Sequence, residues 1–148
     1  MRRLQHTGLT VSELEPSLAF WRDALGMHEV MRQQKRGGYF EAIVGEPDVD
    51  VEIVHLAFDD AGPRIELFAF RSPRRDAHVS RPAEIGFAHV CVVCDDLDEL
   101  LVRLVAAGGT PVSDPVEISS GVNRGGRALY VRDPDGHVLE LFTPAAAR

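Results

Sequence analysis

The chain contains an internal duplication, and this duplication limits the folds that it can adopt. His6 and His89 open two stretches that align in the same order, and the tripeptide Glu-Leu-Phe closes them at 66–68 and 140–142. Between these points hydrophobic positions meet hydrophobic positions, and a glycine meets a glycine. A repeated order of strand, helix, glycine and closing tripeptide predicts two copies of one folding unit.

The first copy begins with a strand and a helix. The segment 4–11 predicts the strand, and Ser12 with Glu15 three residues later predicts a capping box at the start of the helix. Apolar residues then recur at helical spacing, and Gly26 predicts the end of the helix. These apolar residues are Leu14, Leu18, Trp21 and Leu25.

The second copy begins in the same way. The segment 85–94 predicts a strand, and Asp95 or Asp96 predicts the cap of a helix that runs through Ala107. Two glycines at 108 and 109 predict its end.

Both copies continue with further strands. The extended segments predicted in the first copy are 30–34, 39–44, 51–58 and 64–70. Those predicted in the second copy are 111–116, 127–132 and 137–142. Both halves fit the order β-α-β-β-β, with one further extended segment in the first half, and this predicts an α+β fold with two curved mixed sheets and a shared cleft. We expect one domain, 1–148, made of module 1 (about 3–72), a linker (72–84) and module 2 (about 84–144).

Composition and charge exclude several classes of function. The net charge is −7 and no basic run occurs, so a nucleic-acid partner is not expected. No apolar segment approaches the roughly 20 residues of a membrane span, and no apolar segment follows Arg2 and Arg3 as in a signal peptide. We therefore expect a cytoplasmic protein with a small-molecule substrate.

Cys91 and Cys94 lie on a predicted strand and face opposite sides of it, so packing is expected rather than a redox motif.

Two histidines and two glutamates fall at duplicated positions. Imidazole and carboxylate groups are the usual protein ligands of divalent transition metals. Any one of these residues alone is explained more simply, a histidine by hydrogen bonding and a glutamate by facing solvent. Four suitable residues in two equivalent pairs favour a site for one divalent ion: Zn, Ni, Mn, Co or Fe. The predicted ligands are His6, Glu66, His89 and Glu140.

Several motifs resemble the vicinal oxygen chelate superfamily, which includes glyoxalase I, methylmalonyl-CoA epimerase, extradiol dioxygenases and bleomycin- or fosfomycin-resistance proteins. The resemblance covers nearly the whole chain and rests on the segments 4–9, 20–26, 65–68, 89–90 and 133–142. It implies paired β-α-β-β-β modules around a U-shaped metal cleft. It also implies that the first strand of each module supplies a histidine-like ligand and the last strand a glutamate-like ligand. Members of the superfamily often form homodimers, which we also expect here.

The resemblance implies a glyoxalase-like lyase or isomerase that acts on a small substrate chelating the metal through vicinal oxygens. Such an ion acts as a Lewis acid and stabilises the enediolate, so that a side-chain base removes the neighbouring proton. By resemblance Glu140 is the first choice for this base, with Glu66 as its partner on the opposite side.

Two alternatives stay open. An Fe²⁺ extradiol dioxygenase would use His6, His89 and Glu140 as its triad, with His55 as a further acid or base, but Glu66 fills a position that such enzymes leave free. A non-catalytic binder of a drug or natural product would use an aromatic cleft. The candidate pocket residues are Phe40, His55, Phe68, Cys91, Arg124 and Phe142.

Overall fold

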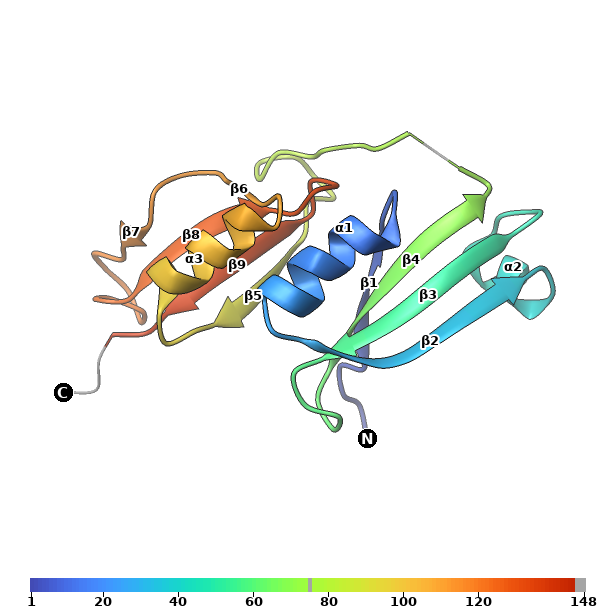
Figure 1. The fold of residues 1–148 in the computed structure, drawn as a ribbon. Helices are drawn as coiled ribbons and strands as arrows, with labels where there is room; N and C mark the ends of the chain where they lie inside the picture. The colour runs from blue at the N-terminus through green and yellow to red at the C-terminus, as the bar shows by residue number, and fades with distance from the viewer. Residues whose placement is uncertain (75, 146–148) are drawn as a thin grey trace. The chain divides into compact units, whose positions relative to one another are not determined.

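The computed structural model describes residues 1–74 and 76–145 and divides the chain into two compact units, Met1–Ala77 and His78–Arg148. Each unit contains one mixed sheet and a helix that contacts it (Figure 1). The boundary between the units lies at residues 77 and 78. The α+β class and the tandem β-α-β-β-β order are confirmed.

The first unit has a four-stranded sheet in the order β1-β4-β3-β2. Strand β1 runs parallel to β4, and the remaining neighbours are antiparallel. Its elements are β1 (His6–Thr10), α1 (Leu14–Leu18), the π-helical turn η1 (Ala19–Ala24), β2 (His28–Arg36), α2 (Tyr39–Val44), β3 (Asp50–Ala57) and β4 (Arg64–Ser72).

The second unit repeats this topology with shorter strands. Its sheet has the order β5-β9-β8-β6, in which β5 runs parallel to β9 and β7 also pairs with β8. Its elements are β5 (His89–Val93), α3 (Leu97–Ala106), β6 (Thr110–Pro111), β7 (Val116–Glu117), β8 (Arg127–Arg132) and β9 (Val138–Thr143). Of the extended segment predicted at 111–116, only the two ends lie in strands, namely in β6 and β7.

Each unit buries the apolar face of its helix and the residues of its central strands. The predicted stripe of the first helix is buried throughout, and Trp21 is fully enclosed. In the second unit Leu97, Leu100 and Leu104 of α3 are buried in the same way. Full burial of each such side chain stabilises the fold by about 1.5–3 kcal/mol, and this packing makes each sheet a rigid support for the polar groups on it.

The segment Tyr39–Val44 was predicted to be a strand, and this prediction is wrong because the segment forms α2. Gly37 and Gly38 precede it with positive φ, and Gly45 ends it in the left-handed conformation. These glycines turn the chain sharply at both ends, which a run of apolar residues alone does not reveal. The helix contributes Phe40 and Val44 to a cluster over Val49, Val51 and Ile53.

The two helices begin differently. Asp96 caps α3 as predicted, with its side chain accepting a hydrogen bond from the Glu99 backbone N–H at 2.9 Å. The predicted Ser12 capping box is wrong, because Glu13 is the N-cap residue of α1 and makes no side-chain capping bond. The Ser12 carbonyl instead accepts a hydrogen bond from Arg74. None of the helices in the described part of the chain is both long enough and apolar enough to cross a bilayer.

Candidate functional site

In the first unit, strand pairing brings His6 and Glu66 together. Parallel pairing sets His6 opposite Arg64 and Gly8 opposite Glu66. His6 and Glu66 are thus offset by one side-chain repeat on the same face, and His6 Nδ1 lies 3.3 Å from Glu66 Oε1. Gly8 lies between them without a side chain, because a Cβ there would lie 2.8 Å from the Phe68 ring.

In the second unit, the equivalent pair meets through the same register. His89 lies opposite Val138 and Cys91 opposite Glu140 in the parallel pairing of β5 and β9. His89 Nε2 lies 2.9 Å from Glu140 Oε2. The duplication predicted from the sequence therefore produces one contacting histidine–glutamate pair in each unit.

A third residue, His55 on β3, also contacts Glu66. Its Nδ1 lies 3.0 Å from Glu66 Oε1, and its Nε2 lies 3.0 Å from the amide nitrogen of Gln33. Nδ1 is buried, and no partner among the described residues is aligned for a hydrogen bond with it in this conformation. Burial lowers the pKa of His55, and the nearby charges of Arg64 and His6 add to this effect while the charge of Glu66 opposes it. His55, predicted as a pocket residue, is buried on the strand next to Glu66 and lies opposite it in the β3–β4 pairing.

Aromatic rings surround the histidine of the second pair. The ring centroid of Tyr130 lies 5.1 Å from that of His89, and Phe87 lies 6.0 Å from His89. Burial raises the pKa of Tyr130, as do the nearby charges of Glu140 and Cys91. The sequence analysis missed Tyr130 and Phe87. Tyr130 could have been found by pairing the two predicted strands 127–132 and 137–142 as a hairpin. In the structure this pairing sets Tyr130 opposite Glu140.

Cys91 shares the face of the second pair. Partial burial, the charge of Glu140 and a hydrogen bond to that carboxylate raise the pKa of the Cys91 thiol to about 11. Cys91 is nevertheless exposed. Its neutral thiol can therefore donate to Glu140 while remaining open to reagents.

The other predicted pocket residues lie in different surroundings. Phe40 stacks on Phe68, with ring centroids 6.3 Å apart, and both pack against the cluster formed by Val49, Val51 and Ile53. They contribute to the core of the first unit. Arg124 is exposed in a turn in which its N–H donates to the Gly121 carbonyl, and Phe142 lies one side-chain repeat beyond Glu140 on β9.

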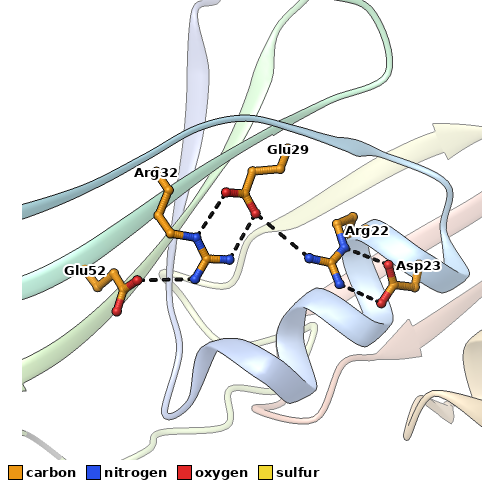
Figure 2. Close-up of polar contacts among 5 residues, drawn as sticks. All are labelled: Arg22, Asp23, Glu29, Arg32 and Glu52. Carbon is orange, nitrogen blue, oxygen red and sulfur yellow. Dashed lines mark hydrogen bonds and ion pairs between the residues drawn. The ribbon is translucent and has the colours of Figure 1, made fainter.

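A hollow of about 550 Å³ lies elsewhere in the first unit, and none of the predicted site residues lines it. Arg32 and Arg71 at this hollow both donate to Glu52, and Arg32 also donates to Glu29. Figure 2 shows this network extending from Glu29 to Arg22. These bonds use guanidinium donors that an anionic ligand would otherwise take up. The hollow is lined by Ser12, Glu13, Leu14, Glu15, Pro16, Arg32, Glu52, Ala69, Phe70, Arg71 and Arg74.

The chemistry of the two pairs fits a divalent ion. Each pair offers one imidazole nitrogen and one carboxylate that already lie within contact distance on neighbouring strands. Over residues 1–74 and 76–145, no group of three or more histidine, cysteine, aspartate or glutamate residues is arranged to hold a metal ion.

Comparison with known proteins agrees with this fold. A glyoxalase family protein from Bacillus cereus superposes with a TM-score of 0.85 at 22% identity, covering 99% of this chain and 96% of that chain. The trypanothione-dependent glyoxalase I of Leishmania major gives a TM-score of 0.68 at 19% identity, covering 97% of this chain and 87% of that chain. At these identities the likeness concerns the fold alone.

Curated relatives resemble the sequence over almost its entire length. Lactoylglutathione lyase of Neisseria meningitidis serogroup A is 29% identical over 142 residues, which cover 95% of this chain and 89% of that protein. A putative lactoylglutathione lyase of Brassica oleracea var. gemmifera is 26% identical over 141 residues, or 95% of this chain. The chain spans only 44% of the length of that plant protein.

The family model described as Glyoxalase/Bleomycin resistance protein/Dioxygenase superfamily matches residues 3–141. This match runs from before β1 into β9 and includes both histidine–glutamate pairs. The chain therefore belongs to the Glyoxalase/Bleomycin resistance protein/Dioxygenase superfamily.

Proposed function

We propose that the chain is a divalent-metal-dependent, glyoxalase-like lyase or isomerase. One histidine–glutamate pair from each unit would supply the ligands of the ion: His6, Glu66, His89 and Glu140. The observation that carries this proposal is the repeated register, which brings a histidine on the first strand and a glutamate on the last strand into contact in both units. A structural role for either glutamate alone would not require the same pair twice.

When bound, the ion would act as a Lewis acid toward two neighbouring oxygens of the substrate and favour loss of the adjacent proton. Glu140 is the base in this proposal. Its side chain is 25% exposed, whereas that of Glu66 is 9% exposed, so Glu140 has freer access to a substrate proton. Cys91 and His89 contact Glu140 and would hold its carboxylate in place between proton transfers.

The names of the curated relatives support a substrate class for this proposal. In a lactoylglutathione molecule the thioester carbonyl lies next to a hydroxyl group, and these are vicinal oxygens of the kind that chelate a metal. We propose an α-hydroxy thioester or the isomeric hemithioacetal as the substrate. In the isomerisation Glu140 takes the proton from one carbon and returns it to the neighbouring carbon, so that no other reactant is consumed.

Solvent exchange tests the proposal directly. The metal-loaded protein is incubated anaerobically in D₂O with lactoylglutathione, and the C2–H signal is followed by NMR. We expect this signal to disappear with the natural chain and to persist with Glu140→Gln. Unchanged exchange in Glu140→Gln would remove Glu140 as the base. Oxygen uptake with Fe²⁺ and a catechol, without any exchange, would favour the dioxygenase reading instead.

A further inference from the structure

A line of polar side chains crosses the sheet of the first unit from β2 to β1. Gln33, His55, Glu66 and His6 lie on four neighbouring strands, and each contacts the next. Gln5 also contacts His6 Nδ1. We infer that His55 is a positioning residue that fixes Glu66 as the stationary carboxylate of the site. This inference rests on the proposed function, because it concerns a ligand of the proposed ion.

Burial of the His55 side chain among apolar residues costs free energy. Val51 and Ile53, the preceding residues on the same face of β3, are buried and apolar, and the side chain of His55 is itself only 8% exposed. A buried polar group costs about 1–3 kcal/mol unless it is satisfied by a partner. The one charged partner within reach is Glu66, at 3.0 Å among the described residues. His55 is therefore best explained by its contact with this carboxylate.

Gln33 determines which nitrogen of His55 carries the proton. The Gln33 amide nitrogen can only donate, so His55 Nε2 accepts and the proton of the neutral ring lies on Nδ1. His55 Nδ1 lies 3.0 Å from Glu66 Oε1, the oxygen that His6 also approaches. The other oxygen takes no part in these two contacts and would be available to the proposed ion.

The second unit lacks this arrangement. Tyr130 lies opposite Glu140 in the β8–β9 pairing, as His55 lies opposite Glu66 in the β3–β4 pairing. The Tyr130 ring packs against His89, with centroids 5.1 Å apart. Glu66 thus contacts a buried imidazole on the neighbouring antiparallel strand, whereas Glu140 contacts the part-exposed His89 and Cys91. In this inference Glu66 is therefore the carboxylate that His55 holds in place, and Glu140 keeps the role of base given to it in the proposed function.

Cobalt binding tests this inference without measuring turnover. Co²⁺ is titrated into the metal-free protein, and its affinity and visible d–d absorption are recorded for the natural chain, His55→Leu, His55→Asn and Ile53→Val. Leucine removes the donor, whereas the asparagine amide can replace the Nδ1–H group. Ile53→Val is the matched control, because it perturbs the same face of β3 without touching Glu66.

We expect His55→Leu to bind Co²⁺ about 10- to 100-fold more weakly with an altered spectrum. His55→Asn should recover most of the affinity, and Ile53→Val should match the natural chain. Equal affinity and spectra for His55→Leu and the natural chain would overturn the inference while leaving the metal function intact. Absence of Co²⁺ binding by the natural chain would overturn both.

A second measurement keeps the inference testable if His55→Leu does not fold. Long-range ¹H–¹⁵N correlation spectra of the metal-free natural chain identify the protonated nitrogen of each histidine. We expect the Nδ1–H form for His55. A proton on Nε2 would remove the donor that faces Glu66 and would overturn the inference.

Discussion

Glu66 and Glu140 occupy the same place in the two units, but their surroundings differ. Both lie on the strand that runs parallel to the first strand of the unit, and both contact a histidine. His55 lies opposite Glu66 on the neighbouring antiparallel strand, whereas Tyr130 lies opposite Glu140. The duplication thus repeats the backbone register, and the neighbouring strand gives each carboxylate a different residue opposite it.

The largest expected effect concerns the two glutamates themselves. Glu140→Gln should lower the rate of proton exchange at the substrate carbon by about 10²- to 10⁴-fold, because the general base is lost. Glu66→Gln should act mainly through weaker metal binding, so saturating metal should restore part of its exchange rate. Exchange rates measured by NMR over a range of metal concentrations would separate the two roles. Identical responses of both variants to added metal would refute the assignment.

Replacing the two neighbouring residues should affect stability differently. His55→Leu leaves the buried carboxylate of Glu66 without one of its two imidazole partners, so we expect a loss of about 1–3 kcal/mol in the free energy of unfolding. Tyr130→Phe keeps the ring that packs on His89 and should change it by less than about 0.5 kcal/mol. Urea denaturation of the metal-free proteins measures both values. A larger loss of unfolding free energy for Tyr130→Phe than for His55→Leu would contradict this prediction.

The helix starts provide a comparison away from the site. Asp96→Ala removes the side-chain cap of α3 and should destabilise the protein by about 1 kcal/mol. Glu13→Ala should cost less than about 0.5 kcal/mol, because the Glu13 side chain makes no capping bond to α1 and its ion pair with Arg74 is exposed. Thermal unfolding of the two variants is the measurement. Equal losses would contradict the helix starts described above.

The smallest expected effect concerns Cys91. Its pKa of about 11 lies above the ordinary thiol value, partly because the Glu140 charge opposes formation of the thiolate. Removing that charge in Glu140→Gln lowers the pKa and enlarges the thiolate fraction, so alkylation by iodoacetamide near pH 8 should be a few-fold faster. The rate is measured in a Cys94→Ser background, so that only one thiol reacts. A slower or unchanged rate would show that Glu140 does not act on Cys91.

Much of the architecture could be predicted because it depends on local chemistry and repetition. The two copies, the central strands, the glycine after the first helix and the Asp96 cap all have signals within a few residues. The helix at Tyr39–Val44 escaped prediction, since its apolar residues also fit a strand and the flanking glycines decide the outcome.

The site was only partly predictable. Equivalent histidines and glutamates are visible in the sequence because each pair belongs to the repeated pattern. The neighbours of each carboxylate are not visible, since they depend on which residue of the adjacent antiparallel strand lies opposite. A one-residue change in that register would place Val54 rather than His55 beside Glu66 and would remove the contact.

The most direct test of the account is the metal content of the reconstituted protein and two single variants. We predict about one divalent ion per chain for the natural sequence, and less than about a tenth for His6→Ala and for His89→Ala, because each variant breaks one of the two pairs. Circular dichroism spectra serve as the control that the variants remain folded. A natural chain that binds no ion after reconstitution, or variants that bind as well as the natural chain, would contradict the central claim.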